Sequence, residues 1–267
     1  MPVTGSLLEG KRILVTRAKE QAATFSDEIV KLGGIPIEIP LIKIEEPKST
    51  EYIETTLQNI HTYDWLVLTS INGVHYFFDF LTKYNIAFTQ TNRPKIAVVG
   101  KKTLEALEKE GITADLIPDQ FVAEDLLDKL QSRVGSNNTI LLARGNLARS
   151  LLPKKLSEIG VKVDDLIIYD TVLNVEKRDE LLSLLKSKSL DIITFTSSST
   201  VTNFVQLLEG IDWQQLLEGI VIACIGPITE KTAIESGIKP QIVAEEYTIT
   251  GLVKAIVNMY DQEESNK

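Results

Sequence analysis

Two arginines and a set of hydroxyl side chains follow short apolar segments of this sequence. Arg17 closes the apolar segment 13–17, and Arg144 closes the similar segment 140–144. Guanidinium and hydroxyl groups donate hydrogen bonds and suit carboxylate or phosphate ligands. The other candidates of this kind end later apolar segments or open the helices that follow them, and they are Thr69, Ser70, Lys101, Thr103, Ser197, Ser198 and Thr229. Together these residue types indicate a site for an anionic ligand.

Each of these residues also has a plainer explanation. Serine and threonine directly before a helix are ordinary N-cap residues. Arg17 and Arg144 can equally form surface ion pairs. The candidates point to a ligand as a set, because all of them would line one kind of sheet edge.

The sequence lacks the residues and motifs that several common kinds of functional site require. Cys224 is the single cysteine, and His61 and His75 are the only histidines, so we expect no disulfide within the chain, no cysteine-based metal cluster and no zinc or iron site. No G-x-G-x-x-G motif follows a strand, and no G-x-S-x-G motif exists. Cys224 lies inside an apolar segment, where a buried and inert thiol is expected.

Charge and hydropathy narrow the class of protein. The net charge of −9 argues against a nucleic-acid partner, which usually requires a basic face. Apolar runs are far shorter than the roughly 20 residues that span a bilayer, and the start of the sequence does not have the pattern of a signal peptide. We therefore expect a cytoplasmic protein with no membrane partner.

An internal repeat organises the chain. At a spacing of 127, segment 13–17 aligns with 140–144, and 68–70 aligns with 195–197. After a one-residue deletion, 97–100 aligns with 223–226 at a spacing of 126. A register held over about a hundred residues predicts two similar structural halves.

Each half predicts the same series of elements. The strands are expected at 13–17, 35–42, 65–69, 95–100 and 115–117 in the first half, and at 140–144, 163–169, 191–196, 220–225 and 241–243 in the second. Four helices are expected at 20–32, 122–131, 147–159 and 248–260. In each half, one more helix is expected directly after the third strand, and another begins at the glycine that ends the fourth strand. The segments 45–50 and 173–178 are expected to be connectors. Short apolar strands that alternate with amphipathic helices predict the α/β class, with two doubly wound, parallel-sheet (Rossmann/flavodoxin-like) domains.

One position breaks the symmetry of the repeat. The strand that contains the sequence IIYDTV at 167–172 has Tyr169 where the first half has Ile42. This difference is either neutral or marks a residue with a function in one copy only.

In this order and spacing, the segments ILVTR at 13–17, LVLTSINGV at 66–74, IAVVGKKT at 96–103, ILLARG at 140–145, IIYDTV at 167–172 and ITFTSSSTV at 193–201 resemble the uroporphyrinogen-III synthase family. IACIGPITEKTAIESGI at 222–238 extends the resemblance. It covers nearly the whole chain to about residue 260.

The resemblance implies a fold and an activity. Residues 1–38 and 172–267 would form one domain and 39–171 the other, joined by hinge strands near 38–43 and 167–173. The enzyme would be a hydro-lyase, without cofactor or metal. It would take hydroxymethylbilane, which carries eight carboxylates, remove water, and close the ring with inversion of the last pyrrole to give uroporphyrinogen III. Tyr169 would lie on the hinge, facing the cleft.

The chemistry suits a phenol. Tyrosine carries its proton at neutral pH and can donate it to the leaving hydroxyl, while the hydroxyl and cationic candidates would bind carboxylates. A core or substrate-stacking tyrosine remains the alternative for Tyr169. For the whole chain, the alternatives are a non-catalytic hinged receptor for an anionic small molecule and a nucleotide-sugar transferase. We expect a monomer, because no apolar helix face is evident.

Overall fold

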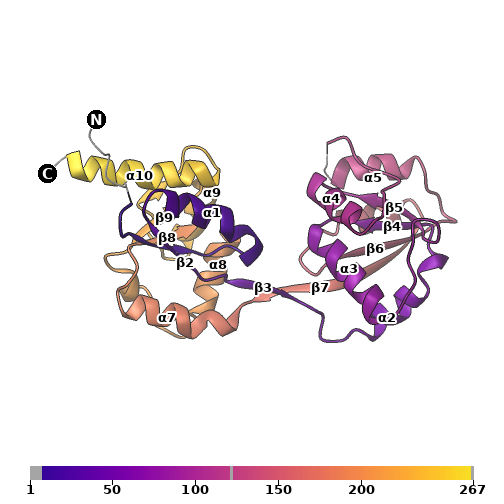
Figure 1. The fold of residues 1–267 in the computed structure, drawn as a ribbon, viewed down its shortest axis with the longest axis horizontal. Coiled ribbons are helices and arrows are strands. Elements are labelled where there is room, and N and C mark those ends of the chain that lie inside the picture. The colour runs from indigo at the N-terminus through magenta and orange to yellow at the C-terminus, as the bar shows by residue number, and fades with distance from the viewer. Residues whose placement is uncertain (1–7, 121–122, 266–267) are drawn as a thin grey trace. The chain divides into compact units, whose positions relative to one another are not determined.

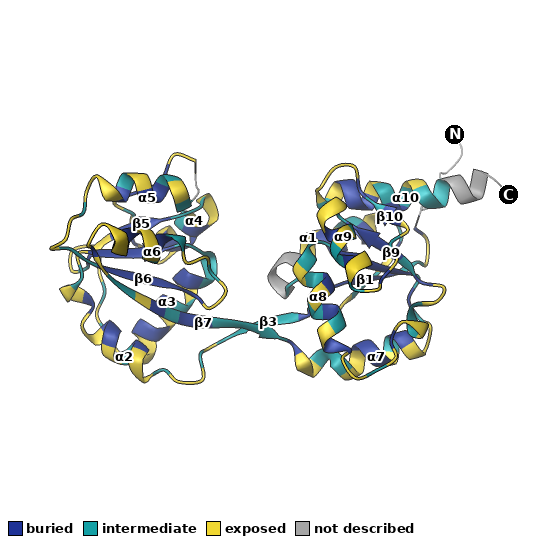
Figure 2. Ribbon diagram, turned by 180° about the vertical axis from the view of Figure 1, so that it is seen from behind, coloured by how far each residue is buried: buried dark blue, intermediate teal, exposed yellow. Residues whose placement is uncertain are grey.

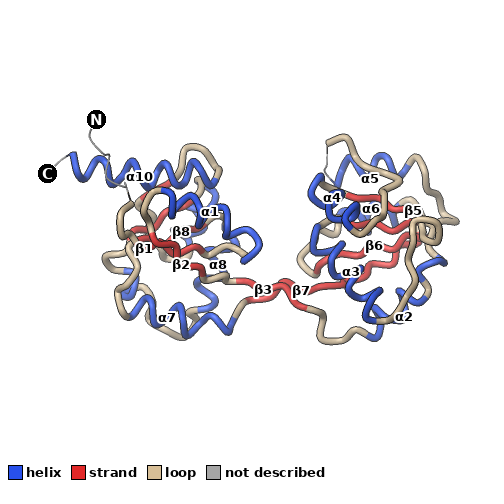
Figure 3. Tube along the Cα trace, viewed as in Figure 1, coloured by secondary structure: helices blue, strands red, loops and turns tan. Residues whose placement is uncertain are grey.

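The computed structural model describes residues 8–120 and 123–265 and shows two compact units. One unit comprises residues 1–43 and 172–267, and the other comprises 44–171. Figure 1 labels the elements of each unit, and Figure 3 shows strands between helices in both. The chain passes from one unit to the other twice, within the neighbouring strands β3 (Ile42–Glu45) and β7 (Lys162–Leu173).

The first unit is built on a parallel sheet in the order β10-β9-β8-β1-β2. Its strands are β1 (Arg12–Val15), β2 (Ile35–Glu38), β8 (Ile192–Phe195), β9 (Val221–Cys224) and β10 (Ile242–Val243). Read from β2, this is the flavodoxin-like order, in which the direction of winding reverses between the first and third strands. In this unit the reversal lies between β1 and β8.

Alternating side chains place a helix layer on each face of this sheet. Leu14 packs with α7 (Arg178–Lys186), α8 (Ser198–Leu207) and α9 (Pro227–Glu235). Ile13 and Val15 face α1 (Lys19–Lys31) and α10 (Ile249–Ser265). The burial colours in Figure 2 show the buried helix faces turned toward the sheet.

The second unit repeats this plan. Its sheet has the order β3-β7-β6-β4-β5, with β4 (Trp65–Leu68), β5 (Lys95–Val98) and β6 (Thr139–Gly145), and the reversal lies between β6 and β4. One face packs on α2 (Glu51–Gln58), α3 (Ile71–Lys83) and α4 (Lys101–Lys109), and the other packs on α5 (Ala123–Gln131) and α6 (Leu151–Glu158). The predicted α/β class with two doubly wound sheets is confirmed.

The units are not the two halves of the repeat. In the first unit, β1 from the first half pairs with β8 from the second. In the second unit, β6 from the second half pairs with β4 from the first. Each sheet is therefore completed by strands from both halves.

Equivalent residues of the repeat end equivalent helices. Gly33 follows α1 with φ 80°, and Gly160 follows α6 with φ 82°. Glycine adopts this left-handed conformation without steric strain, which explains why both helices end there.

Some expected elements differ in the structure. The strand expected at 35–42 is two strands, β2 and β3, interrupted at residues 39–41, and Pro40 there has no N–H to donate to a ladder. The expected connectors are partly structured, because β3 extends to Glu45, β7 to Leu173, and residues 175–177 form a 3₁₀ turn. Only Leu116, in an isolated bridge to Ala97, represents the strand expected at 115–117. The start expected at 122 for the helix over 122–131 lies outside the described residues.

Candidate functional site

Each unit has a pocket at the carboxyl end of its sheet, where the winding reverses. Open α/β sheets bind ligands at this place, because the loops that leave the two diverging strands separate there. In the second unit these loops follow β4 and β6, and in the first they follow β1 and β8. The candidate site residues predicted from the sequence therefore lie at the carboxyl ends of two different sheets.

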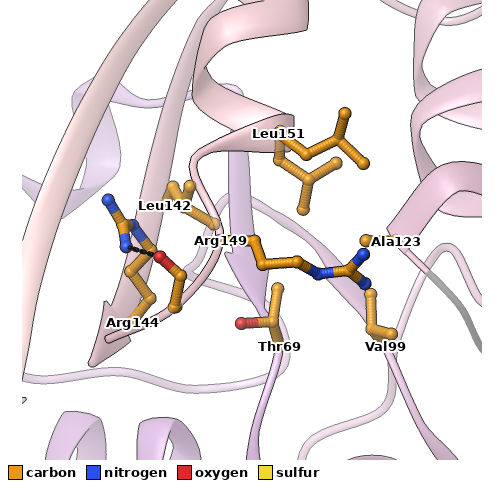
Figure 4. A pocket seen from close by; sticks show the side chains of 9 residues that line it. Thr69, Val99, Ala123, Leu142, Arg144, Arg149 and Leu151 are labelled. Carbon is orange, nitrogen blue, oxygen red and sulfur yellow. Dashed lines mark hydrogen bonds between the residues drawn. The ribbon is translucent and has the colours of Figure 1, made fainter. Parts of the chain in front are cut away.

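The pocket of the second unit measures about 270 Å³. Its lining residues, most of them labelled in Figure 4, are Thr69, Val99, Ala123, Leu142, Arg144, Ala148, Arg149, Leu151 and Leu152. Thr69 leaves β4, and Arg144 is the penultimate residue of β6. The structure therefore brings two predicted site residues, Thr69 and Arg144, to one pocket.

Arg144 is bound mainly by the protein itself. Its Nε and Nη2 donate to the two carboxylate oxygens of Asp165, both at 2.6 Å, and its Nη1 donates to the Ala148 carbonyl at 2.7 Å. The bond to Asp165 outweighs burial and raises the pKa of Arg144, and the charge of Asp165 raises it further. Arg144 thus links β6 to β7 and stabilises the loop after β6. Its role in binding a substrate carboxylate stays a prediction.

Arg149 is a pocket residue that the sequence reasoning missed. In Figure 4 its side chain extends away from Arg144, toward Val99 and Ala123. It is 73% exposed and pairs with Glu124 at 3.1 Å. An exposed ion pair of this kind contributes little stability and exchanges readily. Its position in the loop between β6 and α6, outside any aligned repeat motif, gave no signal in the sequence.

Tyr169 lies on β7, is 9% exposed, and packs on the sheet face that carries α2, α3 and α4, whereas Leu142 and Leu152 of the pocket belong to the opposite face. Its hydroxyl oxygen is 3.1 Å from Oγ of Ser70, so the structure brings these two predicted residues together. Its ring stacks on Tyr76 of α3, with ring centroids 5.6 Å apart and an interplanar angle of 24°. The ring therefore packs in the core while the hydroxyl has a polar partner, and the proton-donor role stays a prediction.

Ser70 connects the phenol to a helix N-terminus. It is the N-cap of α3, and its Oγ accepts a hydrogen bond from the N–H of Gly73 at 2.9 Å. Either hydroxyl can be the donor in the Ser70–Tyr169 contact. When the phenol loses its proton, the Ser70 hydroxyl can donate to it while its oxygen keeps the bond from Gly73. The positive end of the helix dipole and this hydroxyl both favour negative charge on the phenol oxygen.

The pocket of the first unit measures about 250 Å³ and contains Arg17. Its other lining residues are Thr16, Ala18, Leu41, Ile42, Thr196, Ser197, Ser199, Thr200 and Asn203. Ser197 is the N-cap of α8 and forms a capping box with Thr200. Burial lowers the pKa of Arg17. A bound anion would offset this unfavourable desolvation of the guanidinium.

Two predicted residues lie where α8 and α9 approach each other. Ser198 Oγ accepts a hydrogen bond from Thr232 at 2.8 Å and contacts the Ile228 carbonyl at 3.4 Å. Thr229 is buried in the first turn of α9, at 4% exposure. Ser198 therefore has a structural role between the helices, and Thr229 is less accessible than a binding residue usually is.

Lys101 and Thr103 open α4 of the second unit. Gly100 precedes them as the N-cap with φ 96°, a conformation that favours glycine. Lys101 is exposed, whereas Thr103 is 4% exposed. Lys101 and the free N–H groups of the first turn are thus available to an anion.

The remaining chemical candidates from the sequence are structural or exposed. Cys224 is fully buried in β9, and burial raises the pKa of its thiol to about 12. His61 and His75 are exposed. Among the helices that the structure describes, none combines the length and apolar character needed to cross a membrane.

Comparisons with known proteins agree on one family. The family profile described as "Uroporphyrinogen-III synthase HemD" matches residues 23–254. A uroporphyrinogen-III synthase of Synechococcus elongatus is 33% identical over 252 residues, which cover 93% of this chain and 95% of the relative.

Solved structures support the same fold. A mutant uroporphyrinogen III synthase of Thermus thermophilus covers 95% of this chain and 100% of its own, with a TM-score of 0.58 and 19% identity. The corresponding protein of Helicobacter pylori covers 94% of this chain and 99% of its own, with a TM-score of 0.54 and 15% identity.

Proposed function

Because this chain belongs to the uroporphyrinogen-III synthase family, we propose that it is a carbon–oxygen lyase that converts hydroxymethylbilane to uroporphyrinogen III. The structural observation that carries the proposal is the Tyr169–Ser70 pair at the carboxyl edge of the second unit. A phenol held there by a helix-capping hydroxyl can give up a proton and tolerate the charge that remains.

In the proposed reaction, the carbon–oxygen bond of the hydroxymethyl group breaks, and its electron pair leaves with the oxygen. Tyr169 supplies the proton that turns this oxygen into water, while the pyrrole nitrogen releases electrons to the carbon. The last ring then attacks this carbon through its substituted α-carbon and forms a spiro intermediate. The bond between that α-carbon and its original bridging carbon breaks, and the bridging carbon bonds to the unsubstituted α-carbon of the same ring, which inverts the ring. A pyrrole carbon loses a proton when the ring finally closes, which balances the proton that was donated.

Two nearby groups stabilise the phenolate of this step. Ser70 donates its hydroxyl proton to the phenol oxygen, and its own oxygen is held by the Gly73 N–H. The Arg144 guanidinium, which the bidentate bond to Asp165 fixes one residue before Gly145, would favour the same negative charge. General-acid assistance of this kind contributes about 10²- to 10⁴-fold in rate.

The two pockets supply donors for the substrate carboxylates. In the first pocket these donors are Arg17 and Ser197, and in the second they are Thr69 and Arg149. Lys101, exposed at the start of α4, is a further donor outside that pocket. Arg149 enters this set because its exposed pair with Glu124 can be exchanged for a substrate carboxylate. We propose that the two compact units are the two domains of the enzyme, with β3 and β7 as the hinge.

Product analysis tests the proposed function. Purified protein is mixed with hydroxymethylbilane without added cofactor, and the oxidised products are separated into uroporphyrin isomers I and III. We expect isomer III to dominate, because without an enzyme the bilane closes without inversion and gives isomer I. A heat-inactivated sample provides the spontaneous rate. Isomer I alone at that rate contradicts the proposal.

A further inference from the structure

Gly145 ends β6 directly opposite Tyr169. The two residues are paired across the β6–β7 ladder, and the register shifts between Arg144 and Gly145. The next residue, Asn146, donates its N–H to the Tyr169 carbonyl at 3.2 Å. Gly145 is buried and faces the tyrosine ring.

The tyrosine ring occupies the space that a side chain at position 145 would need. A Cβ on Gly145 would clash with both Cε2 and Cζ of Tyr169, and would lie 2.8 Å from its hydroxyl oxygen. Contacts below 3.0 Å do not occur for real Cβ atoms, so one of the two groups would have to move. The ring is confined by the stack on Tyr76 and by the bond to Ser70.

Backbone conformation does not explain this glycine. Gly145 is absent from the glycines with positive φ among the described residues. An L-residue can therefore adopt its backbone conformation, and the three atoms nearest to a Cβ there all belong to the Tyr169 side chain.

The repeat supports this explanation. The positions equivalent to Gly145 and Tyr169 hold Ala18 and Ile42 in the first half. In the aligned sequence, alanine accompanies isoleucine in the first half, and glycine accompanies tyrosine in the second.

We propose that Gly145 is a positioning residue for Tyr169, because its missing side chain leaves the space in which the phenol is held against Ser70. This inference rests on the proposed function, in which Tyr169 is the proton donor. Gly145 contributes no atom to the reaction, and its effect passes entirely through the tyrosine hydroxyl.

The first test is Gly145→Ala, with Gly135→Ala as the matched control. A Cβ on Gly135 meets nothing within 4 Å, and its φ is not in the left-handed region. Since a displacement of about 1 Å can cost about 10²-fold, we expect Gly145→Ala to lower kcat by about this factor with little change in KM. Gly135→Ala should leave both constants unchanged.

The second test separates the hydroxyl from the rest of the site. In the Tyr169→Phe background no donor remains to be displaced, so adding Gly145→Ala should lower kcat no further. A full additional loss in the double variant overturns the proposal, because glycine would then act through another group. Unchanged kcat for Gly145→Ala in the wild-type background also overturns it and leaves the proposed function intact.

A readout independent of activity follows the ring itself. The sequence has seven tyrosines, and fluorotyrosine labelling gives each a ¹⁹F resonance, with Tyr169 assigned by its loss in Tyr169→Phe. We expect Gly145→Ala to shift this resonance and Gly135→Ala to leave it in place. If Tyr169→Phe keeps full kcat, the donor role in the proposed function fails, while a shifted resonance still supports the placement of the ring by Gly145. An unshifted resonance overturns that placement.

A further variant is needed if Gly145→Ala does not fold, and it copies Ala18 and Ile42, the equivalent residues of the first half. Gly145→Ala combined with Tyr169→Ile reproduces the alanine–isoleucine pair. Folding of this double variant, where the single variant fails, supports the clash with the ring. Failure of both variants overturns the proposal.

Discussion

Arg17 and Arg144 occupy equivalent positions of the repeat, yet their surroundings differ. Arg144 is clamped by Asp165 on the neighbouring strand. The residue equivalent to Asp165 in the first unit is Glu38, which accepts a hydrogen bond from Ser26. Arg17 lines a pocket of serine and threonine side chains, and burial lowers its pKa.

This difference shows how the two copies have diverged in chemistry while keeping one backbone plan. In the second unit, the arginine makes the edge beside Tyr169 rigid. In the first unit, it lies among the hydroxyl groups that can bind an anion. The predictions below test this division of roles, and the substitutions are chosen in equivalent or matched pairs.

The largest effect on activity is expected from Tyr169→Phe. This substitution removes the hydroxyl group that distinguishes Tyr169 from Ile42, the equivalent residue of the first half. We expect kcat to fall by about 10²- to 10⁴-fold, with a small change in thermal stability because the ring and its stack on Tyr76 remain. Steady-state kinetics measure the change. The control is Tyr84→Phe, which deletes a long bond of 3.4 Å to the Thr50 carbonyl in the same unit. Equal activity in the two variants would remove the functional difference between the halves.

The next largest effect is a difference between substitutions of Arg144 and Arg17 in protein stability and in KM. Arg144→Met leaves the Asp165 carboxylate without its partner, and we expect a loss of about 2–3 kcal/mol in the free energy of unfolding. Arg17→Met should raise KM for the bilane, since it removes a cation that lines the pocket of the first unit. Denaturant titration and kinetics measure both quantities. Equal destabilisation by the two substitutions would show that the arginines have the same structural role.

A smaller effect concerns two threonines that only the first unit has. Thr16 donates to the Thr194 carbonyl at 2.8 Å, and Thr194 donates to the Leu14 carbonyl at 2.7 Å, both buried. The equivalent residues in the second unit are Ala143 and Val67.

Replacing each threonine by its counterpart should cost about 1 kcal/mol, because the carbonyl acceptors keep their ladder bonds. The measurement is denaturant unfolding of Thr16→Ala and Thr194→Val. A stabilised variant would show that these bonds do not strengthen the β1–β8 pairing.

The smallest effect is a difference in pH response. Asp115 accepts the N–H of Ile96 at 2.8 Å, and Gln241 accepts the N–H of Ile222, its repeat equivalent, at 2.7 Å. Burial raises the pKa of Asp115, but the bonds from Arg93 and Ile96 and nearby positive charges lower it more, so its net pKa lies below the usual value.

The stabilisation from Asp115 is therefore complete above the ordinary pKa of aspartate and is lost as the pH falls through the lowered pKa of the folded state. Hydrogen exchange should show the amide of Ile96 losing protection in acid before the amide of Ile222, whose partner does not titrate. Asp115→Asn should remove that difference, and an unchanged difference in this variant would assign it to another group.

The sequence allowed much of the backbone plan to be predicted. The repeat and the apolar strands indicated two doubly wound sheets, and Gly33 and Gly160 marked the ends of equivalent helices. Helices α2 and α7 were missed, because their short amphipathic patterns lie in segments that carry many charges. Ile53 and Leu57 of α2, and Leu181 and Leu185 of α7, are buried and show the pattern in retrospect.

The candidate site was predicted less completely. Arg144 could be selected by its residue type, but its partner Asp165 lies on the next strand, and the ion pair depends on the register of β6 and β7. Gly145 gave no signal, because a glycine after a strand usually indicates a turn rather than space for a ring. Arg149 depends on the path of a loop, which periodicity does not describe.

The pairing of β1 with β8 has a consequence for folding during synthesis. The sequence of the second unit, 44–171, is continuous, so all of it has been synthesised when translation reaches Val172. The first unit cannot complete its sheet until β8, β9 and β10 follow, and Thr16 must bond to Thr194, 178 residues later. Such distant pairing is slow to form, and domains generally fold as units during translation. The central unit is therefore expected to fold first, while β1, α1 and β2 wait in a non-native state for the C-terminal strands.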